Sequence, residues 1–178
     1  MGFRGLSEIM QKILCNCVQN APERPEYATA LKALQPVLYD LPPVIVAIDG
    51  KSGAGKTTLG RFLSWRFNVS LLESDLFLIR SEQKISYRYD DVRNVILARL
   101  DGNRPIIVEG IVALALLKDT GFDPEFHIRV ECVEADVSDM EESWVGYAAE
   151  WPMQDSRCLV LELPVLHEAP DETPGDCC

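Results

Sequence analysis

The sequence lacks any long hydrophobic run. No stretch approaches the roughly 20 consecutive apolar residues that a membrane-spanning helix requires. The N-terminus also lacks the apolar region and small-residue cleavage site of a signal peptide. We therefore expect a cytoplasmic protein that makes no contact with membranes.

Positive charge is also scarce. The 178 residues carry 17 Lys and Arg against 28 Asp and Glu, which gives a formal net charge of −11. General nucleic-acid binders need a basic surface for the phosphate backbone, so we expect no nucleic-acid partner. The acidic balance does not exclude a nucleotide, because a phosphate-binding loop makes its own local positive field.

The cysteines and histidines form no metal-binding or disulfide pattern. Six cysteines occur without any C-x-x-C pair, and the two histidines do not stand near them at ligand spacing. The simplest interpretation is a set of reduced thiols in an intracellular protein. The hydrophobic fraction of 47% is ordinary for a globular chain and is enough for a real core.

The most informative stretch is a glycine-rich loop. Residues 50–57 satisfy G-x-x-x-x-G-K-[ST], the pattern of the phosphate-binding P-loop. An apolar β-branched run at 44–48 precedes it, and apolar residues recur at helical spacing after it, which is the strand–loop–helix order the motif needs. The residues expected to bind the phosphates of ATP are Gly50, Lys51, Ser52, Gly53, Ala54, Gly55, Lys56, Thr57 and Thr58.

The residue types in this loop match that chemistry. Glycine permits backbone conformations in which loop amides point at phosphate oxygens, and the next helix adds its positive N-terminal end. Lys56, expected to be an exposed charge at the loop end, would reach the β- and γ-phosphates, and the Thr57 hydroxyl would ligate Mg2+. The alternative is a glycine-rich turn that binds nothing, against which the correctly placed Lys and Thr argue.

Strands and helices are predicted to alternate along the chain. Apolar runs indicate strands at 44–48, 69–73, 105–109, 126–130 and 158–161, with helices between them. Such alternation is typical of α/β proteins. We predict a three-layer P-loop NTPase fold with a five-stranded parallel sheet and helices on both faces.

Three separated segments are predicted to meet at one edge of this sheet. Gly50, Asp75 and Glu109 each lie at the carboxyl end of a predicted strand, where parallel sheets bind ligands. A carboxylate there can orient a hydroxyl for attack on a bound γ-phosphate. Asp75 could instead be a helix cap or turn residue, and Glu109 a charge facing solvent. Asp49 could contact the water shell of a metal or form a structural hydrogen bond.

Residues 48–58, 74–77 and 107–114 resemble the uridine kinase-like group of P-loop kinases, which is related to phosphoribulokinase and bacterial pantothenate kinase. The resemblance covers roughly residues 43–165. It implies that Asp75 accepts the proton of the attacking hydroxyl and that Lys56 is the second catalytic residue. It also implies that Glu109 holds Mg2+, directly or through water.

The sequence departs from this family in two places. The acceptor-binding region is short, and only Tyr87, Arg88 and Arg93 are conspicuous candidates for binding a small-molecule acceptor, while a helix-surface role fits both arginines equally well. The family also carries an arginine-rich segment after the fourth strand, which covers ATP. The equivalent stretch here, 131–142, is acidic and contains no arginine. An arginine for the phosphates would then come from the acceptor side, from Arg80, Arg88 or Arg93, or from a second subunit.

The expected function is therefore an ATP- and Mg2+-dependent kinase that transfers the γ-phosphate to a hydroxyl of a nucleoside-like molecule or another metabolite. The alternative is a nucleotide-binding regulatory module or an NTPase with little phosphotransfer. Asp75 favours the kinase, because nucleotide binding alone does not need it. The missing arginines favour the alternative.

The expected organisation has three parts: a helical extension at 1–42, a P-loop kinase-like domain at 43–166 and an acidic tail at 167–178. Within the extension, residues 6–18 show one apolar face of a helix, and a second helix is predicted from Tyr27 to Leu38. The first helix packs either on the main domain or on a second subunit, and a homodimer through the N-terminal helices is one option.

Overall fold

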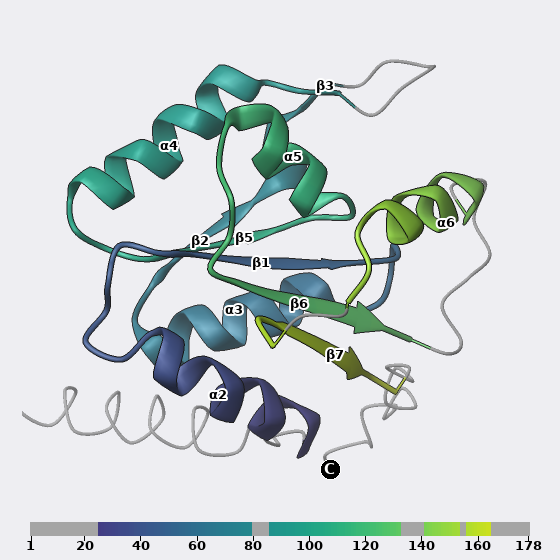
Figure 1. The fold of residues 1–178 in the computed structure, drawn as a ribbon, viewed down its shortest axis with the longest axis horizontal. Helices are drawn as coiled ribbons and strands as arrows, with labels where there is room; N and C mark the ends of the chain where they lie inside the picture. Colours follow the sequence, from purple (N-terminus) through teal and green to yellow (C-terminus); the bar gives the residue numbers. More distant parts are fainter. Residues whose placement is uncertain (1–24, 80–85, 133–140, 154–155, 165–178) are drawn as a thin grey trace, which may run out of the picture.

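The structure, a computed structural model, describes residues 25–79, 86–132, 141–153 and 156–164. Within these ranges the chain forms a three-layer α/β arrangement, with helices above and below one central sheet (Figure 1). The predicted helix at 6–18, Arg80, most of the acidic stretch at 131–142 and the tail at 167–178 lie outside the described residues.

The sheet has five parallel strands in the order β2-β5-β1-β6-β7. Neighbouring strands are in parallel register throughout, so all their carboxyl ends meet at one edge. The predicted five-stranded parallel sheet is confirmed, with each strand within a few residues of its expected place. The strands are β1 (Ile45–Gly50), β2 (Ser70–Glu73), β5 (Ile106–Glu109), β6 (Phe126–Glu131) and β7 (Cys158–Glu162).

Helices cover both faces of the sheet, as predicted (Figure 1). One face carries α2 (Pro25–Val37) and α3 (Lys56–Phe67). The other carries α4 (Tyr89–Asp101), α5 (Ala113–Thr120) and α6 (Glu141–Glu150). Two cores result because β1 is buried on both faces: Val46 and Ile48 pack toward α2 and α3, and Ile45 and Ala47 toward α4 and α5.

Helix α2 belongs to the first of these cores. Its buried residues Tyr27, Ala30 and Leu34 pack in one cluster with α3, β6 and β7. The apolar face of this predicted helix is therefore used within the subunit. Pro36 lies in its last turn, where the helix is about to end at Val37.

A small hairpin that periodicity did not predict follows β2. The 3-10 helix η1 (Ser74–Phe77) leads into β3 (Leu78–Ile79), which pairs antiparallel with β4 (Ser86–Tyr87). The sequence here is polar without a clear period, so two-residue strands give no signal in a pattern search. In the described part of the chain, no helix is long and apolar enough to cross a membrane.

Candidate functional site

The P-loop connects the central strand β1 to helix α3 at the carboxyl edge of the sheet. Gly55 is the N-cap of α3 with φ of 91°, a left-handed conformation that favours glycine, and no side chain caps the helix. A Cβ on Gly50 would collide with the Val130 carbonyl oxygen. The backbone therefore needs glycine at positions 50 and 55. Because no side chain caps α3, its first backbone amides have no side-chain acceptor, which is what an anion-binding site requires.

Lys56 is buried, with 7% of its surface exposed, which corrects the expectation of an exposed charge. Its Nζ donates a 2.6 Å hydrogen bond back across the loop to the Lys51 carbonyl oxygen. Burial lowers the pKa of Lys56, and the charges of Glu109, Asp75 and Asp49 oppose that shift. The ammonium group of Lys56 therefore lies against the backbone of the loop and adds its positive charge there.

The remaining loop residues line the same turn. Ala54 is buried, and its amide bonds to the Lys51 carbonyl oxygen at 3.3 Å. Ser52, Gly53 and Thr58 are exposed. The predicted phosphate-binding residues thus form one continuous turn around the start of α3.

Thr57 and Glu109 lie together, as the prediction of a shared metal site requires. The Thr57 hydroxyl donates a 3.2 Å hydrogen bond to Glu109 Oε1. Glu109 is only 2% exposed, and burial raises the pKa of its carboxyl group, while Thr57 and Lys56 lower it. A hydroxyl and a carboxylate side by side are oxygen donors of the kind that Mg2+ takes from a protein, so the residues fit that ion.

Asp75 is exposed on η1, which follows β2 at the carboxyl edge of the sheet. Its negative charge raises the pKa values of Lys56, Tyr87 and Glu109, so the carboxylate lies within electrostatic range of all three. Tyr87 is buried, and burial raises the pKa of its phenol, as do the charges of Asp75 and Glu109. The phenol therefore stays protonated at neutral pH and lies beside the acidic groups.

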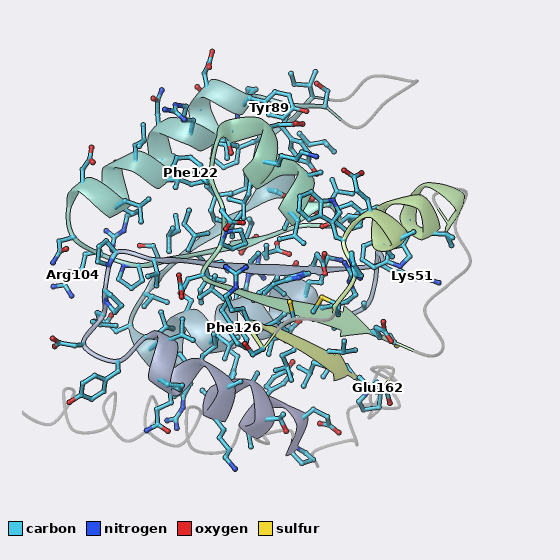
Figure 2. All side chains as sticks on the ribbon, in the orientation of Figure 1. Lys51, Tyr89, Arg104, Phe122, Phe126 and Glu162 are labelled. Atoms are coloured by element: carbon cyan, nitrogen blue, oxygen red, sulfur yellow. The ribbon has the colours of Figure 1, made fainter. Side chains whose placement is uncertain are left out.

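Arg88 and Arg93 are not brought into this cluster. Arg88 donates to the Leu76 carbonyl oxygen at 2.9 Å and lies 3.4 Å from an Asp91 oxygen, so it connects η1 to the start of α4. Arg93 donates to the Thr120 carbonyl oxygen at 2.7 Å and lies over the Phe122 ring. Figure 2 shows Phe122 well away from Lys51. Both arginines make the helix-surface contacts that were the alternative interpretation.

Asp49 is fully buried and bound to protein groups. Its carboxylate accepts hydrogen bonds from Arg129 Nε and a terminal guanidinium nitrogen at 3.2 and 3.1 Å, and from the Tyr147 hydroxyl at 2.7 Å. His127 Nε2 lies 2.9 Å from Oδ1. Burial would raise the pKa of Asp49, but His127 and Arg129 together hold it below its ordinary value. Of its two predicted roles, the structure supports the structural one.

Arg129 and Tyr147 are site residues that sequence reasoning missed. Arg129 is 4% exposed in the middle of a strand buried on both faces. A buried arginine needs a carboxylate partner, and Asp49 is its register neighbour on β1. The arginine in an otherwise buried strand was the available signal. The sequence contained no such signal for Tyr147, because its contact with Asp49 depends on how α6 packs against β1.

A cavity of about 270 Å3 adjoins the loop. Figure 2 shows Lys51 and Glu162 at the end of the sheet toward which the strands point, opposite Arg104. Trp144 of α6 supplies an aromatic ring to this cavity, and Glu131 and Glu162 supply two carboxylates. The full lining is Lys51, Val130, Glu131, Cys132, Trp144 and Glu162.

No protein-family model matches the sequence, and no curated protein matches it. Among solved structures, the chain is similar to a possible uridine kinase from Bacillus stearothermophilus, with a TM-score of 0.51 and 14% identity over 78% of this chain and 98% of that one. It also resembles a sugar kinase from a Janibacter species, with a TM-score of 0.46 and 15% identity over 68% of this chain and 85% of that one. These similarities show the fold alone.

The five-stranded parallel sheet and the G-x-x-x-x-G-K-T loop between β1 and α3 together form the P-loop NTPase architecture. The fold class predicted from the sequence is therefore confirmed. At the loop of this chain, Lys56 is buried and Thr57 contacts Glu109.

Proposed function

We propose that this protein is an ATP- and Mg2+-dependent kinase that transfers the γ-phosphate of ATP to a hydroxyl of a small molecule. The observation that carries the proposal is that Lys56, Thr57 and Glu109 lie at one edge of the sheet, where Asp75 follows the neighbouring strand β2. Nucleotide binding alone has no need of Asp75. The acceptor is a nucleoside-like molecule or another hydroxyl-bearing metabolite, and the possible uridine kinase of the same fold is consistent with that class.

ATP would bind through its phosphates and its nucleoside at adjacent places. The loop amides and Lys56 would hold the phosphates. The cavity beside Lys51 would take the nucleoside, because Trp144 offers a ring for the base and Glu131 and Glu162 offer acceptors for ribose hydroxyls. Thr57 and Glu109 would hold Mg2+, which neutralises phosphate charge when bound.

Asp75 and Tyr87 would act on the acceptor. The Asp75 carboxylate is exposed, so an acceptor hydroxyl can reach it and transfer its proton during attack. The Tyr87 phenol is buried and keeps its proton, so it would form part of the wall of the acceptor site and would not take a proton. The roles of these two residues differ, because only the carboxylate can take the proton.

A second candidate is a nucleotide-binding module with little phosphotransfer. Three arginines of the described residues that could have served the phosphates are committed elsewhere: Arg88 to Leu76 and Asp91, Arg93 to Thr120, and Arg129 to Asp49. The stretch 131–142 contains no arginine in its sequence. An enzyme built this way would transfer phosphate slowly.

Two measurements test the proposal. Mg·ATP should raise the melting temperature of the wild type but not of Lys56→Met, which keeps most of the buried side-chain volume. Lys32→Met is the matched control, since Lys32 is an exposed lysine on α2, outside the P-loop. A screen of hydroxyl acceptors with γ-labelled ATP then separates the two candidates. Equal stabilisation of wild type and Lys56→Met would overturn the nucleotide site.

A further inference from the structure

A buried ion pair lies directly before the P-loop. Asp49 and Arg129 are 0% and 4% exposed and face each other as register partners on β1 and β6. The guanidinium bonds both carboxylate oxygens, at 3.2 and 3.1 Å. Removing one partner of such a pair leaves an uncompensated buried charge, so its geometry is strongly held.

Helix α6 takes part in this pair through Tyr147. The phenol donates a 2.7 Å hydrogen bond to Asp49 Oδ2 and accepts a 3.1 Å hydrogen bond from the Leu114 amide. That amide lies in the first turn of α5, whose N-cap residue Val112 provides no side-chain acceptor. One phenol oxygen therefore joins β1, α5 and α6.

The aromatic rings of α6 also enclose the guanidinium. Arg129 lies 5.4 Å from the ring centre of Trp144 and 5.8 Å from that of Tyr147. A desolvated guanidinium next to aromatic rings is a favourable contact. Trp144 at the same time lines the cavity beside Lys51. The position of α6 thus affects both the base of the P-loop and the space next to it.

The place of Asp49 determines where the loop begins. Gly50, the first residue of the motif, follows it directly and lies so close to the Val130 carbonyl that it has no room for a Cβ. A shift of Asp49 would move Gly50 against β6. The amides that face a phosphate depend on that starting point, because catalytic and binding geometry fails with displacements of about 1 Å.

We propose that Tyr147 is a positioning residue for the nucleotide: its hydrogen bond to Asp49 couples the docking of α6 to the phosphate-binding geometry of the P-loop. The inference rests on the proposed function, since it requires ATP to bind at this loop. Coupling between two sites is reciprocal. Docked α6 should strengthen ATP binding, and bound ATP should hold α6 in place.

The test compares Tyr147→Phe with Thr120→Val. Both remove one buried hydroxyl on the same face of the sheet, and the Thr120 hydroxyl donates to the Leu116 and Leu117 carbonyl oxygens at the far end of α5. Calorimetry with Mg·ATP should show Tyr147→Phe weakening affinity by about 5-fold or more, the lower end of typical coupling between sites. Thr120→Val should bind like the wild type although its melting temperature falls.

Hydrogen exchange provides the readout that a merely structural role would not change. Mg·ATP should increase amide protection of residues 144–150 in the wild type, and this increase should be smaller in Tyr147→Phe. Equal ATP affinity of wild type and Tyr147→Phe, or no added protection in the wild type, would overturn the inference and leave the proposed function intact. If the wild type binds no ATP, both are overturned.

Discussion

The Thr57 hydroxyl donates a 3.2 Å hydrogen bond to Glu109 Oε1, joining the first turn of α3 to the carboxyl end of β5. The two residues stand 52 positions apart in the chain. Their contact arises because β5 is the neighbour of β1 and both strands end at the same edge. It is the contact at which we propose that Mg2+ binds.

Glu109→Gln should lower the affinity for Mg2+ in the presence of ATP by roughly 10-fold or more, a scale typical of groups that support a metal. The amide keeps the size of the side chain but removes its charge. Titration of Mg2+ at fixed ATP, followed by thermal shift, measures the effect. Glu73→Gln is the control, because Glu73 is paired with Arg61 at 2.7 Å on the neighbouring strand. A similar loss in both variants would contradict a specific metal role for Glu109.

Asp75→Asn should keep ATP affinity and lower phosphotransfer by roughly 100-fold or more, the usual scale for removing a general base. The substitution preserves size and most hydrogen bonding but cannot accept the hydroxyl proton. Calorimetry with Mg·ATP and a transfer assay together give the two quantities. Asp91→Asn, at the exposed pair with Arg88, serves as the control. Equal loss of ATP binding in Asp75→Asn would instead assign Asp75 to the metal.

Asp49→Asn should destabilise the protein at neutral pH by about 3 kcal/mol or more, because Arg129 would lose its buried partner. The pKa of Asp49 is held below its ordinary value of 3.8, so its contribution is complete above that value and is lost as the pH falls through the lower folded-state pKa. The difference in unfolding free energy between wild type and variant should therefore be constant near neutrality and shrink below about pH 4.

Urea unfolding of both proteins at several pH values measures this difference. The raised pKa of Glu109 gives the unfolding free energy a pH dependence of the opposite sign. Because Glu109 is present in both proteins, this contribution cancels in the difference between them. If the difference in unfolding free energy stayed the same down to pH 3, the ionised Asp49 carboxylate would not be the source of the stabilisation.

Gly110→Ala and Gly146→Ala should have opposite effects. A Cβ on Gly110 would overlap the Ser74 Oγ, and overpacking of this kind costs about 1–3 kcal/mol. Gly146 lies inside α6 with nothing within 4 Å of its Cβ position. Alanine there should stabilise the helix by about 0.5–1 kcal/mol. Thermal unfolding of the two variants gives the comparison, and a loss of stability in both would contradict the local explanation.

Phosphotransfer by the isolated chain should be slower than the ordinary kinase range of roughly 1–100 per second. Arg88 and Arg93 are held by Leu76 and Thr120, so Arg93→Ala should leave turnover unchanged while lowering stability. Steady-state kinetics of wild type and Arg93→Ala would check this prediction.

The same kinetics at several protein concentrations address a second subunit. Turnover that rises with protein concentration would indicate an arginine donated by a second subunit. Ordinary rates from a monomer that lacks Arg80, Arg88 and Arg93 would refute the argument.

The sequence by itself determined the fold class and the position of the glycine-rich loop between β1 and α3. The strand–loop–helix order around residues 50–57 and the apolar runs of the strands are local signals, because a strand buried on both faces has to be apolar along its whole length. Asp75 and Glu109 could be assigned to one edge for the same reason, since parallel strands place their carboxyl ends together.

Tertiary structure alone decided how individual polar groups are used. Lys56 was expected to be exposed, but its stem is buried and its ammonium folds back to Lys51. Asp49 could have faced a metal or the protein, and Arg129 and Tyr147, distant in sequence, settled that choice. Such partners follow from how β6 and α6 pack around β1. A buried charge takes whichever partner the packing provides, and local periodicity carries no information about that partner.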